Sequence, residues 1–238
     1  MQGVLLIDKP KGWTSFDVVN FVRRIVATSE GKKPKNVKVG HTGTLDPFAT
    51  GLLVLLVGKE YTRRAAELTK LDKAYEITMK LGETSTTGDP EGEISIAESS
   101  NPTPEALQVA LDQYKGQIMQ VPPAYSAIKV NGQRAYKLAR AGKEVIIEPR
   151  AVTVNALEVV EYIYPEARLI ADVSSGTYIR TLVEDIAKTL GTGAYTTELR
   201  RTRVGTFDIN QVTVDINALK LGEAVELDKR LLILHSAV

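Results

Sequence analysis

The chain has 238 residues, of which 25% are charged and 43% hydrophobic, and its formal net charge is only +1 at pH 7. This composition is ordinary for a globular protein in water and argues against a uniformly basic nucleic-acid binder. Cysteine is absent and the histidines are His41 and His235 alone, which excludes disulfides, a thiolate nucleophile and a histidine-rich metal site. The N-terminal apolar run is too short for a signal peptide, and no run reaches membrane-spanning length. We therefore expect a cytoplasmic protein without a membrane partner.

The charges are segregated along the chain. Gly31–His41 carries four lysines and no acid, Lys129–Lys143 carries five cations and no acid, and three arginines cluster within 200–203. In contrast, Glu83–Glu98 carries five acids and no base. Each run taken singly is typical of a solvated surface. Three basic runs beside glycine-rich segments favour a polyanionic partner, because segregated charge can make one face strongly positive.

The first third of the chain predicts two strands separated by a helix. Residues 4–8 form a short apolar run, and residues 52–57 form an unbroken apolar run between glycines, which indicates a buried strand. Thr14 can cap a helix whose first turn contains Asp17, and apolar residues then repeat at helical spacing until about Gly31. A further helix is expected over 61–71.

The rest of the chain also mixes strand and helix signals. Residues 73–82 alternate, which places Tyr75 on one face of a strand, where periodicity alone favours a core residue over a site residue. Thr103 can cap a helix with Pro104 at its first position, and Asn131-Gly132 indicates a tight turn. Three further elements are predicted: a short basic helix over 135–141, paired strands over 152–164 and 168–173, and an amphipathic helix over 177–190.

Residues 39–57 are the stretch around which the chain is organised. A glycine-rich polar loop with one carboxylate, Asp46, leads into the buried strand. Asp46-Pro47 alone is a common turn opener, but loops on rigid scaffolds are also where chemistry usually sits. The sequence Gly-His-Thr-Gly-Thr-Leu-Asp-Pro-Phe-Ala-Thr-Gly-Leu-Leu closely resembles the catalytic motif of the TruB family of tRNA pseudouridine synthases. The resemblance implies that Asp46 is the catalytic nucleophile, and we expect His41 to position the RNA.

Three more segments resemble motifs of the same family. Lys9-Pro-Lys-Gly-Trp-Thr-Ser is similar to the N-terminal motif, and we expect Lys9 to contact RNA. The strand that holds Tyr75 resembles the second motif, whose tyrosine lies over the target base, so the resemblance makes Tyr75 a catalytic and substrate-binding residue. Residues 194–203 resemble the segment that closes the pocket, with Leu199 as a substrate contact.

A further segment, Ser-Ser-Gly-Thr-Tyr-Ile-Arg-Thr-Leu, contains an arginine in the first turn of the helix predicted over 177–190. A cation there opposes the helix dipole, so Arg180 is either solvated or paired with a carboxylate. The segment resembles the family's third motif. That resemblance implies that Arg180 is catalytic and pairs with Asp46, and that Tyr178 lines the substrate pocket.

Residues 122–150 resemble the mobile thumb insertion with which the family grips its substrate. The expected RNA contacts are Lys129, Arg134, Lys137 and Arg140, interleaved with two tyrosines that suit unstacked bases. The alternative is an ordinary hairpin and helix without a binding role.

The resemblance as a whole implies an α+β fold with a mixed, largely antiparallel sheet flanked by helices. It implies one catalytic domain over 1–238 without the family's usual C-terminal PUA domain, acting as a monomer without a protein partner. The implied reaction converts uridine to pseudouridine at position 55 in the T loop of tRNA, with the T arm as the partner. That isomerisation needs no cofactor, and no metal is expected.

Two other classes of function stay open. The chain could chiefly fold or bind RNA and keep a vestigial site, but intact Asp46, Tyr75 and Arg180 argue against this reading. It could be an aspartate-dependent hydrolase, but the motif lacks the second carboxylate of a two-carboxylate glycosidase.

Overall fold

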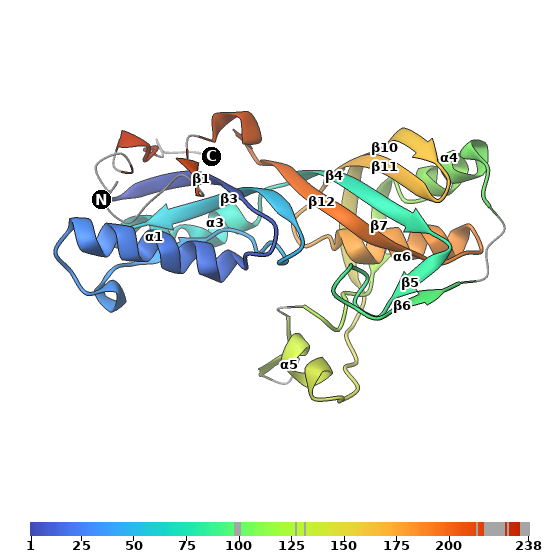
Figure 1. Cartoon of the computed structure of the whole chain (residues 1–238), viewed down its shortest axis with the longest axis horizontal. Helices are drawn as coiled ribbons and strands as arrows, with labels where there is room; N and C mark the ends of the chain where they lie inside the picture. The colour runs from blue at the N-terminus through green and yellow to red at the C-terminus, as the bar shows by residue number, and fades with distance from the viewer. Residues whose placement is uncertain are drawn as a thin grey trace. The chain divides into compact units, whose positions relative to one another are not determined.

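The computed structural model describes residues 1–97, 101–126, 128–130, 132–212, 214–216, 227 and 229–233. The chain divides into two compact units, drawn together in Figure 1. Unit 1 comprises Met1–Tyr75 and Leu199–Val238, and unit 2 is Glu76–Glu198. Strands β4 (Lys73–Leu81) and β12 (Ala194–Val204) have residues in both units. The single catalytic domain expected over 1–238 stays a prediction.

Unit 1 is built around two long antiparallel strands, β1 (Gly3–Lys9) and β3 (Thr50–Val57). The other edge of β3 pairs with β2 (Val39–His41) at one end and, in parallel, with β12 at the other. The remaining elements of this unit are β13 (Phe207–Asp208), β14 (Val214–Asp215), α1 (Ser15–Ser29), α2 (Lys59–Arg63), α3 (Ala65–Thr69) and the 3-10 helices η1 (Pro34–Asn36) and η2 (Ile209–Gln211).

The core of unit 1 explains why residues 52–57 are continuously apolar. Leu52, Val54 and Leu56 pack into a cluster with side chains from β1, α3 and β12, and the alternate residues Leu53 and Leu55 are also fully buried. Because both faces of β3 are covered, the strand needs no polar alternation. Figure 1 shows α1 running along this sheet.

Two helix predictions for unit 1 have different outcomes. Thr14 caps α1 as predicted, and Thr14 and Asp17 form a reciprocal capping box. The single helix predicted over 61–71 is wrong, because the chain forms α2 and α3 with Arg64 between them. Each helix is only five residues long, too short for periodicity to locate the break.

Unit 2 contains a sheet in the order β12, β4, β11 (Glu166–Val173), β10 (Arg150–Ile163) and β7 (Gly116–Gln120), in which β10 is antiparallel to both β11 and β7. Its helices are α4 (Pro104–Asp112), α5 (Ala135–Arg140) and α6 (Ile179–Thr189). Its two small hairpins join β5 (Glu83–Ser85) to β6 (Ile94–Ile96) and β8 (Lys129–Val130) to β9 (Gln133–Arg134). Figure 1 shows α5 standing away from this sheet.

The local signals of unit 2 are confirmed. Thr103 caps α4 with Pro104 at its first position, and α6 buries the apolar stripe that its sequence predicts. Asn131 lies outside the described residues, but Gly132 has a φ of +83° between the two paired strands β8 and β9. The predicted α+β fold with a mixed, largely antiparallel sheet is confirmed. No helix in the described part of the chain is long and apolar enough to cross a membrane.

Candidate active site

The loop between β2 and β3, residues 42–49, carries Asp46, whose side chain is half-buried. Its neighbour Leu45 is held by the buried Ser15 of α1. The Leu45 N–H donates to Ser15 Oγ at 2.8 Å, and Ser15 Oγ donates to the Leu45 carbonyl at 3.0 Å. The Ala49 N–H donates to the Asp46 carbonyl at 3.1 Å and closes a tight turn. The backbone that presents the carboxylate is therefore fixed on both sides of Asp46.

Lys9 and Gly12 fix the next residue, Pro47. The Gly12 N–H donates to the Pro47 carbonyl at 2.8 Å, and Lys9 Nζ donates to the same oxygen at 3.3 Å. Lys9 Nζ also donates to the carbonyls of Pro10 and Trp13, and its side chain is 0% exposed. This burial does not fit the direct RNA contact expected for Lys9. Its ammonium is used to hold the loop from β1.

Arg201 of β12 holds the start of the same loop and the first part of the strand that follows it, β3. Its Nη2 donates to the Gly43 carbonyl at 3.1 Å, and its Nε donates to the Leu52 carbonyl at 2.8 Å. The side chain is 1% exposed, so these bonds form away from water. Gly51 lies opposite Arg201 in the β3–β12 register with a φ of +99°, and a Cβ there would lie 2.7 Å from the Arg201 backbone nitrogen. Gly51 lets β12 approach the loop closely.

Two further cationic groups of unit 1 have lowered pKa values. Burial, and then the charge of Arg201, lower the pKa of His41. His41 Nδ1 is buried and has no hydrogen-bond partner among the described residues. Burial, followed by Arg201, lowers the pKa of Lys73 to about 8, against an opposing effect of Asp72. Lys73 Nζ donates to the carbonyls of Thr69 and Leu71 near the end of α3.

Tyr75 and Leu199 are the other predicted site residues of unit 1. They lie on β4 and β12, and both side chains are almost completely buried. For Tyr75 this burial agrees with its core-facing position in the alternating strand. Its place over the target base, and the substrate contact of Leu199, stay predictions.

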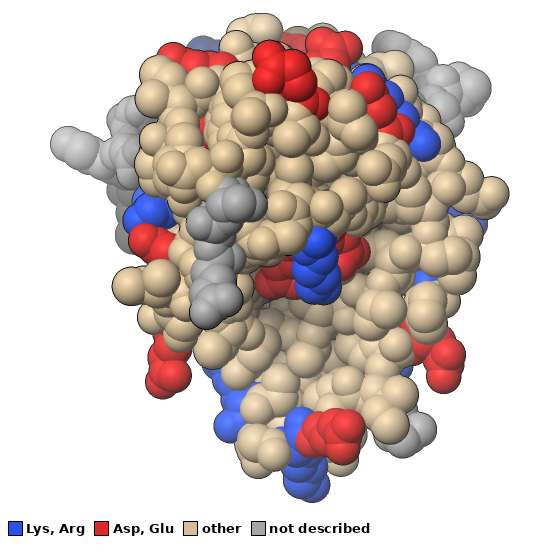
Figure 2. All heavy atoms as spheres, turned by 90° about the vertical axis from the view of Figure 1, so that its right-hand side faces the viewer, with Lys and Arg blue, Asp and Glu red and all other residues tan. Residues whose placement is uncertain are grey.

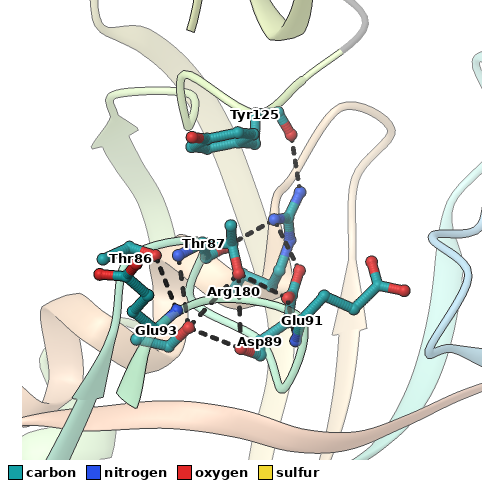
Figure 3. A network of polar contacts seen from close by, with 8 residues as sticks. Thr86, Thr87, Asp89, Glu91, Glu93, Tyr125 and Arg180 are labelled. Atoms are coloured by element: carbon teal, nitrogen blue, oxygen red, sulfur yellow. Dashed lines mark hydrogen bonds and ion pairs between the residues drawn. The ribbon is translucent and has the colours of Figure 1, made fainter. Parts of the chain in front are cut away.

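Arg180 is buried in unit 2 within the polar network drawn in Figure 3. Its Nη1 donates to Asp89 Oδ2 at 2.9 Å and to the Thr87 carbonyl at 2.6 Å, and its Nη2 donates to the Tyr125 carbonyl at 2.9 Å. Asp89 in turn accepts a hydrogen bond from Thr87 Oγ1 at 2.6 Å and one from the Glu91 N–H at 3.0 Å. Arg180 is thus paired with a carboxylate and not solvated, and within unit 2 that carboxylate belongs to Asp89. Its pairing with Asp46 stays a prediction.

Tyr178 precedes the first residue of α6 and is held through its backbone. The buried Gln120 of β7 accepts from the Tyr178 N–H at 2.8 Å and donates to the Tyr178 carbonyl at 3.0 Å. The guanidinium of Arg150 lies 5.1 Å from the centre of the Tyr178 ring, in a cation–π arrangement. The ring is half-buried, and its role in lining a pocket stays a prediction.

The insertion places its four predicted RNA contacts on the surface. Lys129, Arg134, Lys137 and Arg140 are all exposed, and Arg140 lies over the ring of Tyr136 at 5.8 Å. Figure 2 shows basic side chains at the lower end of the view, the level of α5 in Figure 1. Exposed cations beside aromatic rings suit RNA, and contact with RNA stays a prediction.

Sequence reasoning missed Ser15, Asp89, Gln120 and Arg201, which hold the predicted residues in place. Asp89 lies within an acidic run, and a buried arginine needs a carboxylate, so charge pairing was the available signal. The other three act on backbone groups, which leave no mark in the sequence. No three residues of the metal-ligating types His, Cys, Asp and Glu lie close enough to hold a metal within the described part of the chain.

Family models match most of the chain. The model of the TruB family pseudouridylate synthase N-terminal domain matches residues 30–179, and that of the tRNA pseudouridylate synthase B C-terminal domain matches 180–238. The tRNA pseudouridine synthase B of Stutzerimonas stutzeri is 47% identical over 220 residues, which cover 92% of this chain and 69% of the relative. That of Burkholderia mallei is 43% identical over 231 residues, which cover 97% of this chain and 73% of the relative.

Solved structures show the same fold. The chain resembles a protein in the crystal structure of a Cbf5-Nop10-Gar1 complex, with a TM-score of 0.68 and 30% identity over 91% of this chain. It also resembles a protein in the structure of an H/ACA RNP bound to a substrate RNA containing 2'-deoxyuridine, with a TM-score of 0.65, 27% identity and 91% of this chain covered. The match spans about half of each of those proteins, 53% and 52%. The chain therefore belongs to the TruB family of tRNA pseudouridine synthases, which are isomerases.

Proposed function

We propose that this chain isomerises uridine to pseudouridine at position 55 in the T loop of tRNA, with Asp46 as the nucleophile. The observation that carries the proposal is the fixed loop around Asp46. Carbonyls at Gly43, Leu45 and Pro47 accept hydrogen bonds from Arg201, Ser15 and Lys9, which belong to three other elements. A carboxylate presented by such a loop needs little reorganisation before it reacts.

The isomerisation is balanced without an added reactant. The bond between uracil N1 and ribose C1′ breaks, the uracil rotates, and a bond forms between C5 and C1′. C5 loses a proton and N1 gains one, so no electron or group is imported. A cofactor is therefore not demanded by this chemistry.

Asp46 can serve three routes to this product. The carboxylate can attack ribose C1′, attack uracil C6, or remove the proton from C2′. Each route needs the ionised carboxylate. The family resemblance assigns Arg180 to keep Asp46 ionised, because a guanidinium beside a carboxylate favours the charged form. It assigns Tyr75 to stack on the base, from where its hydroxyl can later help to remove the C5 proton.

The target base has to leave the RNA stack to reach Asp46, which costs a few kcal/mol. Phosphate contacts can offset this cost, and the exposed cations of the insertion, such as Lys137 and Arg140, are suited to make them. One structural neighbour belongs to an H/ACA RNP that is bound to a substrate RNA, which supports RNA binding by this fold.

The test is incubation of the pure protein with an unmodified tRNA transcript, followed by mapping of pseudouridine. Product is expected at position 55 and is expected to disappear in Asp46→Asn, which keeps the shape of the side chain but loses the nucleophile. Asp112→Asn, which changes an exposed carboxylate on α4, is the matched control and should act like the wild type. A transcript with cytidine in place of uridine at position 55 should give no pseudouridine there, which checks the position of the reaction in the tRNA.

Two outcomes would overturn the proposal. Substantial turnover by pure Asp46→Asn would remove Asp46 from its role. If the wild type binds tRNA tightly but makes no pseudouridine, the alternative of an RNA-folding protein with a vestigial site is favoured instead.

A further inference from the structure

A cationic pocket lies in unit 1, between α1, η1 and β2. Its volume is about 760 Å³. The residues that line it include Asn20, Arg23, Arg24, Lys35, Lys38 and Gly40. Four of these residues are cations and none is an acid, so positive charge from two separate segments converges on one hollow.

The cations of this pocket differ in how they are held. Arg23 is fixed, because its Nη1 donates to Asn20 Oδ1 at 2.7 Å and its Nη2 donates to the Val39 carbonyl at 3.2 Å. The side chains of Arg24, Lys35 and Lys38 are exposed, and these side chains form no hydrogen bond or ion pair with other described residues. Like charges that converge without an acid repel one another, and a bound anion relieves that repulsion.

An aromatic recess of about 390 Å³ adjoins the cationic pocket. The two hollows share Asn20 and Arg24, so they meet on α1. Trp13, Phe21 and one acid, Asp17, line the recess, and the two ring centres lie 5.8 Å apart with their planes at 84°. If the cations were only a solvated surface, an aromatic recess beside them would not be needed. Trp13 and Phe21 are half-buried, and cations beside accessible aromatic rings suit unpaired nucleotides, with the phosphate on the charges and the base on the rings.

We propose that the cationic pocket binds a backbone phosphate of the RNA substrate and that the aromatic recess receives an adjacent unpaired base. The proposal rests on the action of this chain on tRNA and adds a second contact in unit 1, apart from Asp46. Gly40 lines the pocket and lies in β2 just before His41, and the loop with Asp46 follows directly. A paired strand, and not a linker, connects the pocket to that loop, so a bound phosphate fixes the RNA with respect to Asp46.

The first test is equilibrium binding of a full-length unmodified tRNA transcript at several salt concentrations. The pocket variant Arg24→Gln/Lys35→Gln/Lys38→Gln is expected to raise the Kd at least tenfold at about 0.1 M salt. The slope of log K against log salt should fall by about 0.7, since one phosphate contact on a single strand contributes about that much.

A matched control separates the pocket from general charge. Lys70→Gln/Lys115→Gln/Lys188→Gln removes three exposed lysines outside the pocket and changes the net charge equally. It should leave the Kd within about twofold. If the pocket and control variants bind tRNA alike, or both like the wild type, the phosphate site is refuted.

The second test uses the intrinsic fluorescence of Trp13, which is the only tryptophan in the sequence. A base in the recess should change this fluorescence saturably, with the Kd of the binding assay, and the pocket variant should need more tRNA for the same change. Unchanged fluorescence at saturating tRNA would overturn the base contact. An equal change with poly-glutamate, a polyanion without bases, would mean that the surface binds acidic polypeptide and would overturn its assignment to RNA.

Failure of this proposal is distinguishable from failure of the proposed function. The comparison of Kd values between the pocket and control variants needs no turnover, whereas mapping of the pseudouridine that the wild type forms tests the proposed function alone. If the wild type makes no pseudouridine, the proposed function fails, while the comparison of the Kd values still decides whether the pocket binds RNA.

Discussion

Arg180 and Asp89 form an ion pair with 2.9 Å between Nη1 and Oδ2, and their side chains are only 6% and 4% exposed. The guanidinium lies in the first turn of α6, where the helix dipole disfavours a cation. Asp89 supplies the opposite charge, and two backbone carbonyls accept the remaining hydrogen bonds. The acidic loop between β5 and β6 is therefore a part of the arginine site and not merely a solvated surface.

Loss of this pair should damage both stability and catalysis. Asp89→Ala leaves a buried guanidinium without its carboxylate, which is expected to lower the free energy of unfolding by about 3 kcal/mol. Asp89→Asn keeps the shape, so it should fold better yet still lower kcat at least tenfold, because Arg180 loses the charge that orients it. Urea unfolding and single-turnover kinetics measure the two effects.

Glu93 on the same loop provides the control for this prediction. Its side chain is exposed, so Glu93→Ala should change the free energy of unfolding by less than about 0.5 kcal/mol and leave kcat unchanged. Equal effects of Asp89→Ala and Glu93→Ala would mean that the ion pair contributes nothing measurable.

Arg201 should act on the chemical step through the loop that carries Asp46. Arg201→Lys keeps the charge but loses the planar fork that reaches the carbonyls of Gly43 and Leu52. We expect kcat to fall about 100-fold, since a displacement of roughly 1 Å can have an effect of that size. The Kd for tRNA should change by less than about threefold, because Arg201 is too deeply buried to touch the RNA backbone.

The neighbouring Arg200 provides the control, because Arg200→Lys makes the same substitution on the same strand. It forms a two-pronged pair with Asp8 at 3.0 and 2.6 Å, and it is partly exposed. Arg200→Lys should therefore keep kcat within about threefold. An unchanged kcat in folded Arg201→Lys would show that the loop keeps its geometry without the fork.

Lys73 predicts a dependence of stability on alkaline pH. Its pKa is about 8 in the folded chain against an ordinary value of 10.5, so the unfolded chain binds more protons between these two values. The contribution of Lys73 to stability therefore rises as the pH increases from about 8 to 10.5. The pKa difference corresponds to about 3 kcal/mol across the whole window.

Urea unfolding at a series of pH values measures this effect. The free energy of unfolding of the wild type, relative to Lys73→Met, should increase from pH 8 towards 10.5 and stay level below 8. The exposed Lys70 gives the control, because wild type and Lys70→Met should keep a constant difference. If the difference in free energy of unfolding between wild type and Lys73→Met stays constant from pH 8 to 10.5, the pKa of Lys73 is not lowered.

Signals confined to a few neighbouring residues made much of the fold predictable. The cap at Thr14, the apolar run of β3 and the alternation of β4 each arise within one element. The motif around Asp46 also lies within one stretch, so the loop could be located, although its nucleophilic role stays a prediction.

The contacts that hold the site were not predictable, because each joins distant residues. Arg201 lies 158 residues from Gly43, and Arg180 lies 91 residues from Asp89. Lys9 shows the limit of reading charge alone. A lysine after a short strand is typical of the surface, yet three carbonyls converge on its Nζ and hold it inside.

The last prediction concerns Gly51, the second residue of β3 after the loop that carries Asp46. An alanine Cβ there would collide with the Arg201 carbonyl oxygen, and a φ of +99° is also strained for any L side chain. We expect Gly51→Ala to lower the free energy of unfolding by more than about 3 kcal/mol, because steric conflict with a β-strand backbone adds to the dihedral strain. Gly142→Ala separates these two causes. Gly142 has a φ of +68° and nothing within 4 Å of an added Cβ. Gly142→Ala should therefore lower the free energy of unfolding by only about 1 kcal/mol, through dihedral strain alone. Urea unfolding of both variants measures the difference, and equal losses would mean that β12 moves away from Gly51 without resistance.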